Sequence, residues 1–158
     1  MEVLAVRRDA SRDDPHGLAF VRGPEALDQV LGRSDYVAIT LALTAETRGL
    51  IDARRLGQMK PTAVLINVAR GEVVDEDALY EALHRRAIAA AALDVWYRYP
   101  SGGAPTHPGH RPFHTLPNVL MTPHVSGWTE GMMEARASVI AENIRRVARG
   151  EAPVNLVA

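Results

Sequence analysis

Cysteine is absent from the 158-residue sequence, which excludes disulfide frameworks, thiol catalysis and cysteine-ligated metal sites. No apolar run approaches the roughly 20 residues of a membrane-spanning helix, and no secretory apolar segment follows Met1. The net charge is only −1, so no strongly basic surface indicates binding to a nucleic acid or an anionic membrane. We therefore expect a cytoplasmic protein with no nucleic-acid or membrane partner.

Five short apolar runs alternate with amphipathic segments along the chain. Hydrophobic residues make up 47% of the sequence and charged residues 23%, as in an ordinary globular domain with one core. Runs of four to eight apolar residues are typical of parallel strands that are buried on both faces. The predicted strands cover residues 3–6, 36–41, 63–67, 88–95 and 119–122.

The segments between these runs carry helix signals. Helices are predicted over 24–31 and 53–59, after a cap at Asp75, and from a Thr129 cap to about Arg149, where Gly150 ends the last one. Strands separated by helices predict an α/β fold with a doubly wound parallel sheet. The proline- and glycine-rich stretch at about 100–117 predicts a long flexible surface loop.

Three of the predicted strands run into side chains with functional groups. Arg70, Asp94 and His124 each lie at or just beyond the end of such a strand. In an open parallel sheet, ligands bind beyond the carboxyl ends of the strands, so the three groups are expected to converge on one edge. Taken singly, each has a simpler interpretation: a solvated arginine, a helix-capping aspartate and a turn histidine.

The same stretches resemble the cofactor domain of the D-isomer-specific 2-hydroxyacid dehydrogenase family. The matching blocks are SDYVAITLALTAETRGLI, MKPTAVLINVARGEVVDEDALYEAL, AALDVW and LPNVLMTPHVSGWT, in order along nearly the whole chain. The resemblance implies a Rossmann-type fold and an NAD(P)-linked enzyme that interconverts small 2-keto and 2-hydroxy acids, such as glyoxylate or hydroxypyruvate.

The resemblance also implies roles for individual residues. Arg70 matches the arginine that binds the substrate carboxylate and keto oxygen, which suits a planar, permanently charged group. His124 matches the general acid/base, and Asp94 matches the residue that orients the nicotinamide carboxamide. Further cofactor-binding positions implied by the resemblance are Thr44, Val68, Ala69 and Gly127.

One position departs from the family pattern within the catalytic set. Tyr99 stands where the family usually has a glutamate that pairs with the catalytic histidine and raises its pKa. The phenol of Tyr99 can accept a hydrogen bond from an imidazole but carries no negative charge at neutral pH. Alternatively, another acid replaces the glutamate, the site is degraded, or Tyr99 packs against the turn at Pro100.

The sequence contains no GxGxxG pattern, the turn that cradles a dinucleotide pyrophosphate. Its first predicted strand resembles the family's second strand, so we expect residues 1–158 to be the C-terminal part of a dinucleotide-binding domain, incomplete at its N-terminus. Arg7 and Arg8 fall where an aspartate usually contacts the ribose, which favours NADP over NAD. A solvated basic turn is the alternative interpretation.

Two other functions remain open at this stage. The first is a non-catalytic dimerising or interaction module derived from the same fold, and the second is a relative of the formate or phosphonate dehydrogenases. A homodimer is expected in the enzyme as well. His107, His110 and His114 share the 100–117 loop, but no acidic residues lie near them in the sequence and no metal site is expected.

Overall fold

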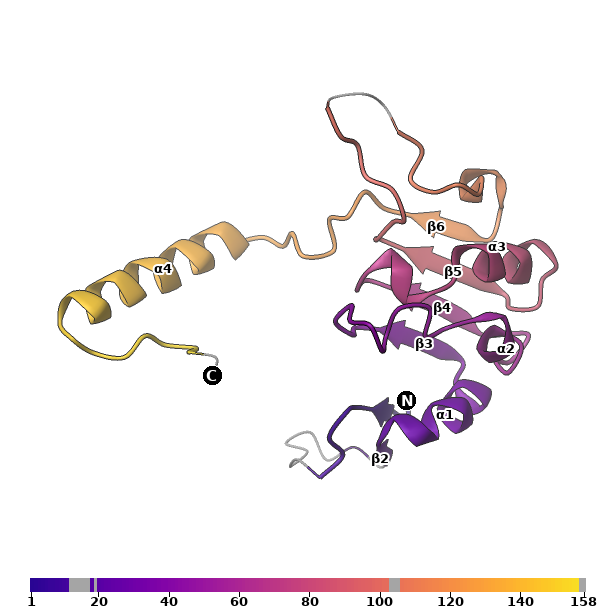
Figure 1. Ribbon diagram of the computed structural model, residues 1–158, viewed down its shortest axis with the longest axis horizontal. Helices are drawn as coiled ribbons and strands as arrows, with labels where there is room; N and C mark the ends of the chain where they lie inside the picture. The colour runs from indigo at the N-terminus through magenta and orange to yellow at the C-terminus, as the bar shows by residue number, and fades with distance from the viewer. Residues whose placement is uncertain (12–17, 19, 103–105, 157–158) are drawn as a thin grey trace. The chain divides into compact units, whose positions relative to one another are not determined.

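The computed structural model describes residues 1–11, 18, 20–102 and 106–156, which form two compact units, Met1–His124 and Val125–Ala158 (Figure 1). The described residues of the first unit form six strands, three helices and three short 3-10 turns. The strands are β1 (Leu4–Val6), β2 (Phe20–Arg22), β3 (Tyr36–Ile39), β4 (Val64–Asn67), β5 (Ala90–Leu93) and β6 (Val119–Met121). The helices are α1 (Leu27–Arg33), α2 (Ala53–Leu56) and α3 (Glu76–His84), and the 3-10 turns are Pro24–Ala26, Gly71–Val73 and Phe113–Thr115.

All the strand pairs of these elements are parallel, and they form two sheets. One sheet pairs β1 with β2, and the other has the order β3-β4-β5-β6 (Figure 1). The predicted parallel α/β architecture is therefore confirmed. The strand β2 was not predicted, because it has only three residues and the last of them is the charged Arg22.

Burial on the larger sheet alternates along each strand. The core joins sheet residues such as Leu65 and Leu93 to Leu79 and Leu83 of α3, all nearly inaccessible to solvent. On the opposite face, Tyr36 is 68% exposed. Within this unit the strands β4 and β5 are buried on the face against which α2 and α3 pack.

The loop predicted over 100–117 is partly built into the core. Residues 103–105 lie outside the described residues, but Phe113 is buried and packs edge-on against the ring of Tyr80. The Glu76 carboxylate of α3 accepts hydrogen bonds from the backbone N–H groups of His110 and Arg111. The described end of this segment is thus held against α3 by both apolar and polar contacts.

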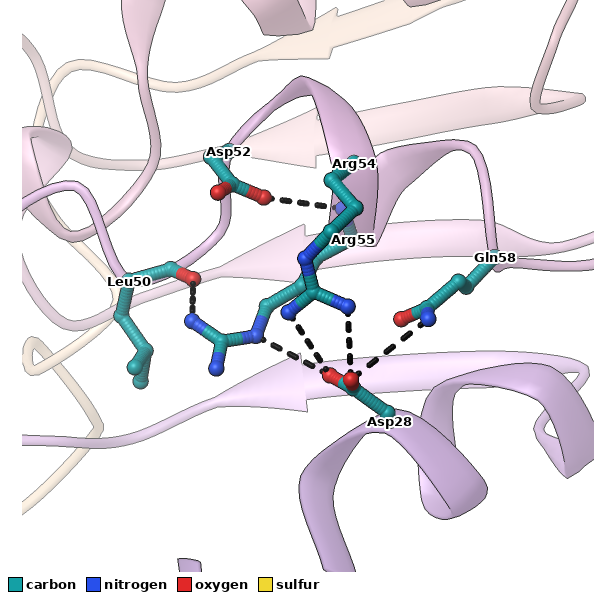
Figure 2. A network of polar contacts seen from close by, with 6 residues as sticks. All are labelled: Asp28, Leu50, Asp52, Arg54, Arg55 and Gln58. Carbon is teal, nitrogen blue, oxygen red and sulfur yellow. Dashed lines mark hydrogen bonds and ion pairs between the residues drawn. The ribbon is translucent and has the colours of Figure 1, made fainter. Parts of the chain in front are cut away.

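The Asp28 carboxylate on α1 forms hydrogen bonds with two arginines of α2. Asp28 accepts hydrogen bonds from the guanidinium groups of Arg54 and Arg55 on α2, and Gln58 lies beside them (Figure 2). The hydrogen bond from Arg54 is the largest of the contacts that lower the pKa of Asp28 from 3.8 to about 2. Asp52 caps α2 by accepting a hydrogen bond from the backbone N–H of Arg55.

The second unit contains one long helix, α4 (Met132–Ala148). It begins three residues after the predicted Thr129 cap, because Gly131 adopts a left-handed conformation (φ 75°) that breaks the helix there. Gly150, at φ 73°, follows its end as predicted. None of the α4 residues, all of which are described, is buried. Within the described ranges, no helix has both the length and the apolar character needed to cross a membrane.

Candidate functional site

Arg70, Asp94 and His124 follow three strands that are neighbours in the larger sheet. Arg70 comes three residues after the end of β4, Asp94 directly after β5, and His124 three residues after β6. The strands β4, β5 and β6 are parallel and adjacent (Figure 1). These three positions therefore lie at the carboxyl end of the sheet. The topology thus places the three residues along one edge.

Asp94 connects two of these strand ends. Its side chain is buried, with 3% of the residue exposed, and Oδ1 accepts a hydrogen bond from the Thr122 hydroxyl at 2.6 Å. Its backbone N–H donates to the carbonyl of Asn67, the last residue of β4. A buried carboxylate is stable only with such partners. Asp94 is therefore held in a fixed place between β4 and β6.

The turn after β4 is shaped by a buried amide that the sequence analysis did not single out. Asn67 is 1% exposed; its Oδ1 accepts a hydrogen bond from the backbone N–H of Ala69, and its Nδ2 donates to the carbonyl of Arg70. The sequence signal that could have identified Asn67 is a polar residue at the end of an otherwise apolar strand. Asn67 fixes the backbone from which the Arg70 side chain extends.

The Arg70 turn packs directly against the end of β5. A Cβ placed on Gly71 would lie 2.5 Å from the carbonyl oxygen of Trp96, so only glycine fits this approach. The Arg70 guanidinium is exposed and donates to the Ala69 carbonyl at 2.6 Å. It forms no ion pair with any residue in the described parts of the chain. Of the two preceding residues, Val68 is 39% exposed and Ala69 is buried.

His124 lies against Tyr99. The Tyr99 hydroxyl is 2.9 Å from Nδ1 of His124, and the ring centroids are 5.6 Å apart with an interplanar angle of 47°. The backbone N–H of Trp96 donates to the same hydroxyl oxygen at 3.1 Å. His124 adopts a left-handed conformation (φ 59°), an uncommon state for a non-glycine residue and one that is found at functional sites.

The Trp96 side chain links this pair to the buried carboxylate. Its indole Nε1–H donates to the carbonyl of Thr122 at 2.9 Å, and the hydroxyl of Thr122 binds Asp94. Hydrogen bonds therefore run from Asp94 through Thr122 and Trp96 to Tyr99 and His124. Thr122 was not predicted as a site residue, since a threonine that follows a strand carries no distinctive signal in the sequence.

Arg7, Arg8 and Thr44 lie around a separate cavity of about 760 Å³ in the first unit. It opens between β1, α1 and β3, and the residues that line it do not include Arg70, Asp94 or His124. Glu46 also lines this cavity, and the hydrogen bond from the Thr44 hydroxyl is the main cause that lowers its pKa below 4.5. Arg8 adds a smaller electrostatic contribution in the same direction.

Gly127 and the three loop histidines belong neither to the residues at the strand ends nor to those that line the cavity. Gly127 belongs to the second unit, so its role stays a prediction. Among the loop histidines, His107 and His114 stack on each other, whereas His110 is hydrogen-bonded to Glu76. The described residues contain no cluster of three or more metal-ligating side chains.

Residues 1–126 match the family model described as D-isomer specific 2-hydroxyacid dehydrogenase, NAD binding domain. The chain is 41% identical over 131 residues to a glyoxylate reductase of Thermococcus onnurineus, and the match covers 83% of this chain and 37% of that protein. It is 43% identical over 131 residues to glyoxylate/hydroxypyruvate reductase B of Pectobacterium atrosepticum, covering 83% of this chain and 39% of that protein.

A solved structure is also similar. It is a D-isomer specific 2-hydroxyacid dehydrogenase from Xanthobacter autotrophicus Py2 in complex with NADPH and MES, with a TM-score of 0.77 and 40% identity. The similarity covers 97% of this chain and 59% of that one. The chain thus corresponds to less than two thirds of the length of these proteins.

Proposed function

This chain belongs to the D-isomer specific 2-hydroxyacid dehydrogenase family, and on that premise we propose that it forms part of an oxidoreductase that uses NAD(P)H to reduce a small 2-keto acid. The observation that carries the proposal is the placement of Arg70, Asp94 and His124 after three adjacent parallel strands. The names of the two reductases support glyoxylate or hydroxypyruvate as the keto acid.

Arg70 and His124 form the substrate side of the proposed site. The exposed guanidinium of Arg70 suits a carboxylate, because its planar N–H fork can donate two parallel hydrogen bonds and keeps its charge at every working pH. His124 provides the proton for the keto oxygen as the carbonyl carbon is reduced. Substrate orientation and proton supply are thereby assigned to two different strand ends.

Asp94 forms the nicotinamide side of the proposed site. A buried carboxylate oriented by Thr122 at a strand end fits the carboxamide of a nicotinamide, which offers N–H donors. When bound, the nicotinamide supplies the hydride. Val68 and Ala69 follow β4 at the same edge and are proposed to contact the ring, as is Gly127 of the second unit.

We assign the adenosine end of the cofactor to the cavity between β1 and β3. Arg7 and Arg8 line it, and two guanidinium groups favour the 2′-phosphate of NADP over the hydroxyl of NAD. Glu46 lies on the same cavity and offsets part of this positive charge. NADPH in the similar Xanthobacter structure supports the NADP preference.

A homodimer is also proposed for this protein. Its support is the exposed apolar side chains of α4, a helix that buries no residue of its own. Ile140, Ile144 and Val147 are 61%, 65% and 62% exposed and lie three or four residues apart, so they share one face of the helix. Apolar patches of this kind mark protein–protein contacts.

The test of the proposed activity is an assay of NADPH oxidation with glyoxylate or hydroxypyruvate by the oxidoreductase of which this chain is part. The reaction is measured as the loss of NADPH absorbance. Arg70→Ala and His124→Ala are expected to lower kcat/KM by about 10²-fold or more. Arg85→Ala is the control. This exposed arginine follows α3 and comes before the start of β5, whereas the proposed site lies beyond the ends of the strands. No keto-acid-dependent oxidation, or near-normal turnover in either variant, would refute the proposal.

A further inference from the structure

The contact between Tyr99 and His124 carries a further inference, which rests on the proposed function for its catalytic meaning. Tyr99 occupies the position at which the family pattern led us to expect a glutamate. Its hydroxyl is 2.9 Å from Nδ1 of the imidazole and 3.1 Å from the backbone nitrogen of Trp96. Within the described ranges, no carboxylate forms an ion pair with His124. The phenol is therefore the polar side chain that faces Nδ1.

The Trp96 contact favours the Tyr99 hydroxyl as the donor to Nδ1. A backbone N–H can only donate, so the Tyr99 oxygen accepts from Trp96. If the oxygen also accepted from Nδ1–H, its own hydrogen would have no acceptor among the described residues. If the hydroxyl instead donates to Nδ1, each atom has a partner. The oxygen accepts from the Trp96 N–H, and the hydroxyl hydrogen is donated to Nδ1. The second arrangement pairs all the polar groups of the contact within the chain, whereas the first leaves the hydroxyl hydrogen to solvent.

We propose that Tyr99 is a positioning residue that holds His124 as the neutral tautomer with its hydrogen on Nε2. A neutral imidazole has one donor and one acceptor nitrogen, so a hydroxyl that donates to Nδ1 places the hydrogen on Nε2. Nε2 is then the atom from which a proton reaches the keto oxygen. As it leaves, the Tyr99 hydroxyl hydrogen passes to Nδ1, so the imidazole stays neutral and the negative charge moves to the phenol oxygen, which accepts the hydrogen bond from the Trp96 N–H. A glutamate at this position would accept from Nδ1–H and stabilise the imidazolium instead.

The backbone supports this assignment. Trp96 is held by the indole hydrogen bond to the Thr122 carbonyl, so its N–H has a fixed direction toward the phenol. His124 itself is set by its left-handed conformation. Both ends of the Tyr99–His124 hydrogen bond are therefore attached to defined backbone positions, although both side chains are exposed to solvent.

The experiment is a long-range ¹H–¹⁵N correlation spectrum of the labelled chain near neutral pH, with His124→Gln to assign the resonances. The wild type is expected to show a hydrogen on Nε2 and an unprotonated Nδ1 at His124. Tyr99→Phe removes the hydroxyl and is expected to give a mixture of both tautomers. Tyr97→Phe, which removes a hydroxyl two residues away, is expected to leave the His124 signals unchanged.

Tyr99→Glu tests the same contact by placing a negative charge beside Nδ1 of His124. A carboxylate beside Nδ1 is expected to move the pH midpoint of the His124 signals upward by about one unit or more. An unmoved midpoint, Nδ1–H in the wild type, or a Tyr99→Phe spectrum like that of the wild type would overturn the inference.

The spectrum does not depend on turnover, so the two proposals can fail separately. Keto-acid reduction without the Nε2–H tautomer would refute only the role of Tyr99. The tautomer without any reduction would refute the proposed activity while the positioning contact stands.

Discussion

Replacing Gly71 by alanine tests whether the Arg70 turn is seated against the end of β5. The added Cβ would lie 2.5 Å from the carbonyl oxygen and 2.6 Å from the carbonyl carbon of Trp96, and 3.1 Å from the backbone nitrogen of Tyr97. These are backbone atoms of the segment that follows β5, so they cannot move aside as a flexible side chain would. The turn that carries Arg70 must shift instead.

Overpacking of this kind destabilises proteins by about 1–3 kcal/mol. For a chain of this size, each kcal/mol lowers Tm by about 2–4 °C, so the expected loss is roughly 2–12 °C. Gly32→Ala is the matched control: it adds the same methyl group within α1, where the nearest atom, the Gln58 carbonyl oxygen, is 3.5 Å from the new Cβ. Since glycine within a helix costs about 0.5–1 kcal/mol relative to alanine, this control is expected to raise Tm by roughly 1–4 °C.

The assay is thermal unfolding of the purified chain and of both variants. Circular dichroism in the far ultraviolet monitors the loss of structure as the temperature rises. The reasoning predicts shifts of opposite sign for one and the same chemical change. A Gly71→Ala variant with a Tm equal to or above that of the wild type would refute the close packing of the Arg70 turn on Trp96. The position of Arg70 at the sheet edge would then need another explanation.

Two further predictions concern other parts of the molecule. The pKa of Asp28 is lowered in the folded state from 3.8 to about 2, so its stabilising contribution is present above about pH 4 and is lost as the pH falls toward about 2. Urea unfolding at about pH 5 and about pH 2.5 should therefore show a smaller loss of stability for Asp28→Asn than for the wild type; equal losses would argue against the Arg54 contact. If α4 forms the homodimer contact, Ile144→Asp should reduce the mass measured by light scattering to that of a monomer, whereas Arg136→Ala, on the same helix, should not. A wild-type chain that is monomeric at every concentration would exclude the dimer.

The agreement between sequence and structure is greatest for the larger sheet. The predicted runs 63–67 and 88–95 contain the strands β4 and β5, since their apolar residues have no stable place outside a core. The predicted cap at Asp75 accepts a hydrogen bond from the backbone N–H of Ala78, as the local spacing requires. These features depend on neighbours in the sequence or on burial, and both can be read from the order of residues.

Contacts between residues that are far apart in the sequence were harder to predict. The hydrogen bond from Thr122 to Asp94 joins residues 28 positions apart, and the Tyr99–His124 contact spans 25 positions. The sequence suggested a partner for His124 only through the family pattern, and it could not say whether the phenol reached the imidazole. The role of Asn67 was missed because its hydrogen-bonding partners are backbone atoms, which every residue has.

By itself the sequence determined the parallel α/β class, the family, and which residue types follow the strands, because hydrophobic periodicity and local motifs are properties of neighbouring residues. Only the tertiary structure decided that one sheet face is covered by α2 and α3, that a buried amide shapes the Arg70 turn, and that a phenol rather than a carboxylate contacts His124. The physical reason is that burial and hydrogen-bond geometry depend on which strand ends meet in space, and that follows from the order and register of the strands.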